Sequence, residues 1–297
     1  MSAGRFIKVT CLGCLAAVAL LVVVVGVALL AARQGLERQR IEDAELAAGD
    51  RAAGALTASA PGRVVLDLSH GEFYVHPAGP GEGLLVKARF DHDAYALSDS
   101  LEILPDSTWV YRVEYRRTIS GLQSILRSLL GGGNDSRVDV FLPPDLPIAL
   151  EVRVRQGGAE AQLGGLWLTD AVIDFGMGGF ALDIAEPLRE PLEQLVIGGH
   201  MGGFEATGLG NASPRRLAVD CKMGGADLDL GGEWLRDCDV RLSVDMGGMN
   251  VEVPAGLDVQ GVIVDRPHLR PENPEVALPV LRVTTQANRG EIEFTRR

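Results

Sequence analysis

Basic side chains are in the minority in this sequence. Of its 297 residues, 28 are Lys or Arg and 40 are Asp or Glu, which gives a formal net charge of -12. No run of Lys or Arg interrupts this acidic balance. Because a nucleic-acid partner requires a basic face to meet its phosphates, the composition excludes nucleic acid as a partner class.

Cysteine is also scarce, with four in the chain. Cys11 and Cys14 open an apolar N-terminal run, and we interpret them as membrane residues because a lipoprotein box would stand at the end of such a run. Cys221 and Cys238 could pair in an oxidising compartment. Their inward positions at different heights of the repeat described below favour two free thiols in the core instead.

The short motifs of common enzyme sites are missing. The chain has no G-x-S-x-G, no Walker loop and no H-E-x-x-H, and its single "DFG", at 174–176, lacks the partner motifs of a kinase. "DHD" at 91–93 suggests a metal, but on a strand both carboxylates would face away from His92. His70 and His76 are expected at the surface. The sequence therefore predicts no catalytic residue, no cofactor or metal site and no small-molecule substrate.

One long apolar run is present near the N-terminus. Residues 9–32 carry no charge and would reach about 36 Å as a helix, enough to cross a hydrocarbon core of about 30 Å. A cleaved signal peptide has a shorter apolar region, so the run predicts an uncleaved single-pass anchor after a short tail of residues 1–8. Basic residues flank both sides of the run. We expect the C-terminal part outside the cytoplasm because the foldable mass lies beyond the span.

Beyond the anchor the chain changes character twice. Residues 33–60 are rich in Ala, Glu and Arg and predict a polar helical stalk or linker. From residue 61 onward, segments of strand length alternate apolar and polar residues or run apolar. One break, Ser120 to Asp135, places Leu122, Ile125, Leu126, Leu129 and Leu130 on one helical face. It predicts a short amphipathic helix, which we interpret as a cap over the core rather than a membrane or partner contact.

A repeat dominates the C-terminal half. Glycine doublets recur about every 21–24 residues, a spacing typical of solenoids, and four of the five are preceded by Met: Gly157–Gly158, Gly178–Gly179, Gly202–Gly203, Gly224–Gly225 and Gly247–Gly248. "LGGLW" and "LGGEW" place Trp167 and Trp234 at corresponding positions. "SHGEFYV" from Ser69 and "NRGEIEF" from Asn288 are degenerate copies, expected near the two ends.

Alternation around each doublet predicts a strand, a corner and a second strand with one buried face. Ile173, Phe175 and Met177 share this face before one doublet, and Phe180 and Leu182 share it afterwards. Glycine is expected at the corner for its backbone freedom, and methionine for filling the irregular space inside it. The outward positions are rich in carboxylates, and Ala181, Thr207 and Asn250 interrupt one of their columns. We therefore expect a solvated acidic face rather than a cation site.

Residues 138–259 resemble a known bacterial family. The marks are "LPPDLP", "GLGNA" at 208–212, "GGEW" at 231–234 and the repeated glycine corners. They are similar to the toast-rack, or adhesin-type, β-solenoid domains of unknown function, which are related to the C-terminal domain of LiaF-type cell-envelope stress proteins. Members often have Gly-x-Gly-[Asp/Glu] corners, whereas this chain has Met-Gly-Gly. The resemblance implies a fold, a membrane-anchored setting and an envelope role, but no catalytic residue.

These observations predict an all-β protein, a β-solenoid over 61–297 with its best repeats at 138–259. We expect it to be a non-enzymatic module of the bacterial cell membrane that binds an envelope or membrane protein, as an interaction or accessory sensing module. The alternative is an adhesin-like module that binds a surface or polymer. An enzyme with acids clustered on one face ranks third.

Overall fold

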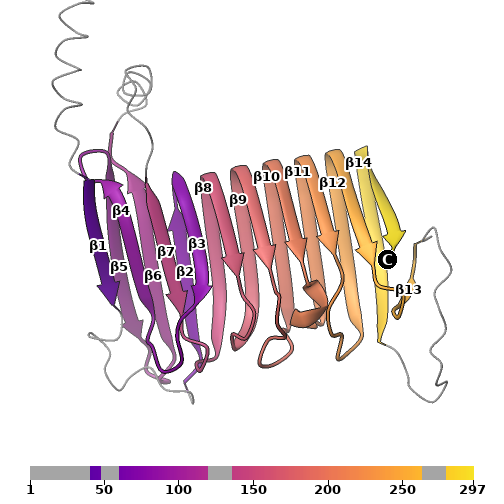
Figure 1. The fold of residues 1–297 in the computed structure, drawn as a ribbon, viewed down its shortest axis with the longest axis horizontal. Coiled ribbons are helices and arrows are strands. Elements are labelled where there is room, and N and C mark those ends of the chain that lie inside the picture. The colour runs from indigo at the N-terminus through magenta and orange to yellow at the C-terminus, as the bar shows by residue number, and fades with distance from the viewer. Residues whose placement is uncertain (1–40, 48–59, 120–135, 263–278) are drawn as a thin grey trace, which may run out of the picture.

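Long strands, all but the last bent at a glycine doublet, form most of the protein. The computed structural model describes residues 41–47, 60–119, 136–262 and 279–297 (Figure 1). In the C-terminal half, each long strand pairs in parallel with the next long strand along the chain, so that the doublets stand side by side. These strands are β8 (Ile148–Gln162), β9 (Leu168–Asp183), β10 (Gln194–Thr207), β11 (Arg216–Asp229), β12 (Cys238–Val253) and β14 (Val280–Arg296). The short β13 (Asp258–Gln260) pairs with β14.

The first glycine of each doublet is a strained corner, as the sequence predicts. Gly178 has φ 133°, and a Cβ added there would lie 1.9 Å from the carbonyl oxygen of Gly157 in the preceding strand. Gly157, Gly202, Gly224 and Gly247 repeat both features. Only glycine adopts this backbone at low cost. Each strand bends at its corner along the upper edge of the molecule and returns on the other side (Figure 1).

The N-terminal end is built from shorter strands. β2 (Gly62–Leu68) and β3 (Gly71–Pro77) pair with the first and second halves of β8, and Gly71 stands opposite Gly157. The copy at Ser69 is therefore a real turn of the repeat, and so is the copy at Asn288, where Gly290 stands opposite Gly247. The first copy is not terminal, however. β6 (Trp109–Arg117) and β7 (Arg137–Leu142) pair beyond it, followed by β5 (Tyr95–Ile103) and β4 (Leu85–Asp91).

The helical stalk predicted for 33–60 is wrong where the structure describes it. Residues 41–47 form β1 (Ile41–Ala47), which pairs antiparallel with β4. Ala44 and Leu46 pack against the core. β4 would otherwise present unpaired backbone groups on one side, and this long-range pairing outweighs the helical propensity of an Ala- and Glu-rich segment.

Three other predicted segments lie outside the described residues. They are the span at 9–32, the rest of the stalk and the amphipathic helix at 120–135. In the part of the chain that the structure does describe, the one helix is a 3₁₀ turn, η1 (Leu209–Ala212). No helix within the described ranges has the length and apolar character needed to cross a membrane.

The side chains that are buried along each strand follow the predicted alternation except at the corners. Aromatic rings fill the inside of the bend in β9 and β10: Phe175 lies 5.2 Å from both Phe180 and Phe204, between ring centroids. Gly199 stands beside Phe175 in register, and a Cβ there would approach that ring to 2.6 Å. A large side chain in one strand thus occupies space that its neighbour leaves empty. Cys221 and Cys238 are buried free thiols, as predicted.

The predicted place of the methionines is wrong. Met177, Met201 and Met246 expose 48, 43 and 42 % of their surface, and Met223 is partly exposed. In β9 and β10 the phenylalanines already occupy the inside of the bend. In the register of the parallel strands, the residue before each methionine has no paired residue on the next strand. The inward–outward alternation therefore shifts at that point, and the methionine side chain points outward.

The two tryptophans are not equivalent either. Trp234 is buried and donates its Nε1–H to the carbonyl oxygen of Leu230, at 2.8 Å. Trp167 is partly exposed beneath the guanidinium of Arg189, while Leu166 fills the buried position beside it. The matching sequence offsets therefore do not place these rings at the same point of the fold.

Candidate functional site: an acidic groove along the glycine corners

The second glycine of each doublet leaves the outer surface open. A Cβ at Gly158, Gly179, Gly225 or Gly248 would meet no atom within 4 Å, and one at Gly203 would meet only a carbonyl oxygen at 3.9 Å. These glycines align across β8 to β12. Together they form a line of backbone without side chains that runs across the strands, which we call the glycine floor.

A groove of about 540 Å³ follows this floor from β3 to β11. Glu72 and Tyr74 line one end, and Asp227 lines the other. Glu160 and Glu205 line it between them. Its lining residues come from β3 and from β8 to β11, so its long axis crosses the strands.

Carboxylates dominate the surface on this side of the corners. The segments that follow the corner glycines in β3 and β8–β12 contain no Lys or Arg. We call their outer surface the acidic face; its carboxylates are Glu72, Glu160, Asp183, Glu205, Asp227, Asp229 and Glu252. Neighbouring strands lie about 4.8 Å apart, so adjacent carboxylates would repel each other.

Neutral donors separate some of these carboxylates. Asn250 donates its side-chain N–H to Asp227 Oδ1 at 2.7 Å, and Thr207 donates its hydroxyl to Asp183 Oδ1 at 3.0 Å. Ala181 and Asn250 interrupt the column of Glu205 and Asp227 as predicted, whereas Thr207 stands in the neighbouring column, beside Asp183. Glu252 is paired with Arg297, whose Nη1 lies 3.2 Å from its Oε2.

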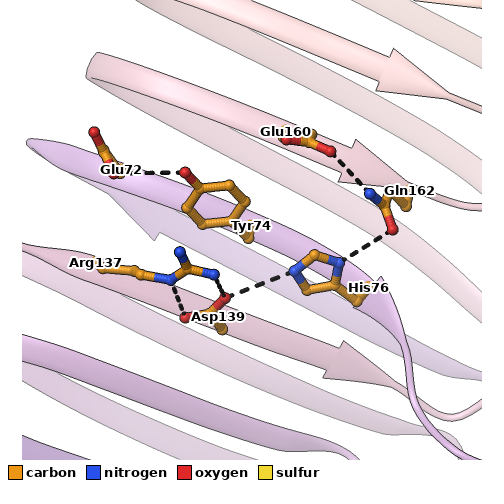
Figure 2. A network of polar contacts seen from close by, with 7 residues as sticks. All are labelled: Glu72, Tyr74, His76, Arg137, Asp139, Glu160 and Gln162. Carbon is orange, nitrogen blue, oxygen red and sulfur yellow. Dashed lines mark hydrogen bonds and ion pairs between the residues drawn. The ribbon is translucent and has the colours of Figure 1, made fainter.

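At the N-terminal end of the acidic face, polar side chains from β3, β7 and β8 form a continuous network (Figure 2). Arg137 donates two hydrogen bonds of 2.7 Å to the carboxylate of Asp139. Its guanidinium lies 4.1 Å from the ring centroid of Tyr74. The Tyr74 hydroxyl in turn lies 3.5 Å from Glu72 Oε2.

His76 links this cluster to β8 (Figure 2). Its Nε2 lies 3.6 Å from Asp139 Oδ1, and its Nδ1 lies 3.4 Å from Gln162 Oε1. Gln162 donates to Glu160 Oε1 at 2.8 Å. His76 is thus partly exposed at the surface, as predicted, with its ring parallel to that of Tyr74.

The charges of the network stabilise one another. The hydrogen bonds that Arg137 donates to Asp139 raise the pKa of its guanidinium. Partial burial raises the pKa of the Tyr74 hydroxyl, and Glu72 shifts it in the same direction. At neutral pH the Tyr74 hydroxyl is therefore a neutral donor, and the Arg137 guanidinium keeps its positive charge.

Sequence reasoning missed this network. Tyr74 and Arg137 are far apart in the chain and meet because β3 and β7 are neighbours. The available signal was that 72–76 and 137–141 place polar or aromatic residues at every outward position. No pattern within either segment indicates that the two lie side by side.

His76 and His200 each lie beside a carboxylate. His200 Nε2 lies 2.9 Å from Asp174 Oδ1 on the side opposite the acidic face. In the described ranges, the side-chain hydrogen bonds of His76 and His200 run to Gln162 and Asp174, not to a hydroxyl or thiol. Nucleophilic catalysis needs such a group beside the base.

The geometry expected for 91–93 is wrong. β4 ends at Asp91 and the next residues form a turn, so ligand atoms of Asp91, His92 and Asp93 lie within 4.8 Å of one another. Asp91 Oδ1 accepts a hydrogen bond from the Asp93 backbone N–H at 3.0 Å. This turn accounts for the cluster, and the absence of a metal site stays a prediction.

His70 is less exposed than expected. It is half-buried and stacks on Tyr95, with 6.3 Å between ring centroids. Burial lowers the pKa of its imidazole, and Arg117 shifts it in the same direction. His70 is therefore a packing residue beside the Gly71 corner.

Comparison with known proteins gives distant likenesses. No family model matches the chain, and no curated protein matches its sequence. A "putative cell adhesion protein" from Clostridium sporogenes is 11% identical over 87% of this chain and 100% of its own, with a TM-score of 0.43. A "putative adhesin" from Bacteroides fragilis is 8% identical over 86% of this chain and 97% of its own, with a TM-score of 0.37. A "putative adhesin" from Parabacteroides distasonis is 9% identical over 86% of this chain and 98% of its own, with a TM-score of 0.26. The predicted relation to LiaF-type proteins stays a prediction.

Proposed function

We propose that the chain is a membrane-anchored, non-enzymatic β-solenoid that binds an extended, positively charged segment of an envelope or membrane protein along its acidic face. The groove over the glycine floor is the observation that carries the proposal. It crosses the strands, is lined by carboxylates and has exposed backbone where an extended partner can approach closely.

Anchoring supports this role. The uncharged run at 9–32 tethers the domain, in our proposal with its C-terminal part outside the cytoplasm. A tether raises the effective concentration of a second membrane protein near the groove. We therefore expect the domain released from its anchor to fail to complement a deletion of the protein. Complementation by the soluble domain would contradict the tethering.

Charge-matched variants test the groove in the full chain. Glu205→Gln with Asp227→Asn removes two charges beside the groove, and Asp220→Asn with Asp245→Asn removes two from the opposite side. Both doubles have the same net charge. We expect only the first to weaken binding of a fluorescent decalysine peptide, by at least about tenfold, which corresponds to about 1.4 kcal/mol. Anisotropy at low and high salt measures the effect.

Equal weakening by the two doubles would show that net charge and not the groove attracts the peptide, and would contradict the proposal. Unchanged binding by the first double would contradict it as well. Thermal midpoints close to that of the parent are required of both variants, so that a folding defect is not mistaken for lost binding.

A carbohydrate polymer is the second candidate, and the network of Figure 2 favours it. The Tyr74 and His76 rings are parallel within 5° and lie beside planar hydrogen-bonding groups. Sugars stack on such rings. Binding of soluble envelope polysaccharide that is lost in Tyr74→Ala but kept in Glu205→Gln would favour this adhesin-like function over the first.

A further inference from the structure

Four methionines, three exposed and one partly exposed, form a single ladder across adjacent strands. Met177 pairs with Met201, Met201 with Met223, and Met223 with Met246 in the parallel register. Neighbouring strands lie about 4.8 Å apart. The chain has six methionines, and four of them stand in this one column.

The methionine side chains of the ladder reach the surface. Three of the four side chains expose more than two fifths of their surface, and each is followed by a glycine that offers no side chain to cover it. A methionine side chain is unbranched with three rotatable bonds, so neighbouring thioethers can turn toward a common point. Leucine would supply an equally apolar edge, but it has no donor atom.

Two potential ligands beside the ladder each make a hydrogen bond. Asp245, which precedes Met246, accepts a hydrogen bond from Asn288, and His200, which precedes Met201, is bonded to Asp174. Lys222 precedes Met223 and is a cation. The thioethers of the ladder prefer soft monovalent ions such as Cu(I) over Ca²⁺, Mg²⁺ or Zn²⁺.

We propose that the methionine ladder binds a soft monovalent cation, Cu(I) or its redox-stable analogue Ag(I), through the thioethers of adjacent strands. An ion needs at least two neighbouring methionines. Met201 and Met223 are neighbours, whereas Met177 and Met246 are separated by about 14 Å and cannot share an ion. This site is independent of the acidic groove.

Silver binding by the full chain in detergent tests the proposal. The background is Cys11→Ser with Cys14→Ser, because thiolates also bind silver; Cys221 and Cys238 are buried. Silver nitrate is titrated in chloride-free buffer by equilibrium dialysis, and metal content is measured by mass spectrometry. Met201→Leu with Met223→Leu should weaken binding by at least about tenfold, equivalent to about 1.4 kcal/mol.

Two matched variants isolate the adjacent pair. Met177→Leu with Met246→Leu should still bind silver, because the central pair remains. Met249→Leu changes a buried methionine and should bind as the parent does. Methionine-to-leucine changes conserve volume, so all variants should fold. Parent-like binding by the central double, or an equal loss in Met249→Leu, would overturn the proposal.

A measurement without mutation gives a second readout. With ¹³C-labelled methionine methyl groups, silver should shift the resonances of Met201 and Met223 and leave that of Met249 in place. An excess of Ca²⁺ or Zn²⁺ should not reverse the shift. Silver binding that moves none of the ladder resonances would also overturn the proposal.

Discussion

Alanine at Gly224 and alanine at Gly225 should have opposite effects on stability, although the two residues are adjacent. Gly224 has φ 140°, and its added Cβ would lie 1.6 Å from the carbonyl oxygen of Gly202. The contact is with backbone on the neighbouring strand, so no side-chain rotation can relieve it. Gly225 has open space at its Cβ position.

The magnitudes follow from these two geometries. A non-glycine residue in such a backbone region costs about 1–3 kcal/mol. Moving β10 and β11 apart also weakens hydrogen bonds worth about 1 kcal/mol each. Gly224→Ala should therefore cost at least about 3 kcal/mol and lower the thermal midpoint by about 6–12 °C. Gly225→Ala reduces the freedom of the unfolded chain and should stabilise by about 0.4–1 kcal/mol.

Far-ultraviolet circular dichroism during heating, with urea midpoints as a second measure, distinguishes these outcomes. Gly178→Val and Gly224→Val should each cost more than about 1 kcal/mol for the same reason. Equal midpoints for Gly224→Ala and Gly225→Ala would refute the assignment of strain to the first glycine of the doublet. A larger loss of stability in Gly225→Ala than in Gly224→Ala would assign the strain to the second glycine instead.

Three further outcomes are expected. Burial raises the pKa of the Cys238 thiol to about 12, so an aromatic disulfide reagent at about pH 8 should label it only after unfolding; fast labelling of native protein would contradict its burial. The folded-state pKa of His70 is lowered from 6.5, so the unfolded state binds the proton more readily and stability should fall as the pH drops through about 6.5. His70→Gln should reduce the change of the urea midpoint with pH between about pH 7.5 and 5.5. The same pH dependence in this variant as in the parent would exclude His70 as the cause. The run at 9–32 should keep the chain in membranes after a carbonate wash, and a C-terminal reporter should be active only outside the cytoplasm; a reporter active only in the cytoplasm would reverse the topology.

The repeat itself could be predicted from the sequence because its determinants are local. A corner glycine is needed wherever the backbone takes a φ that other residues avoid, and the doublets mark those places. Alternation then assigns residues such as Ile173 and Leu182 to the core. The same alternation placed Cys221 and Cys238 inside, and both thiols are buried. Each of these inferences needs only the neighbouring residues in the chain.

The candidate sites depended on contacts that no local pattern specifies. The Figure 2 network exists because β3 lies between β7 and β8, an order that differs from the order along the chain. β1 is a strand because the edge of β4 offers it hydrogen-bond partners.

The direction of the methionines was decided in the same way. Period-two alternation holds along a regular strand, and by that rule Met177 belongs inside with Phe175. The bend interrupts the pairing and shifts the alternation by one residue, and the rings of Phe175, Phe180 and Phe204 already fill the interior. The sequence by itself determined that the chain turns at each doublet, because the backbone angle there is a property of glycine. Only the tertiary structure decided which side chains the turn leaves outside, because that depends on the volume already occupied by neighbouring strands.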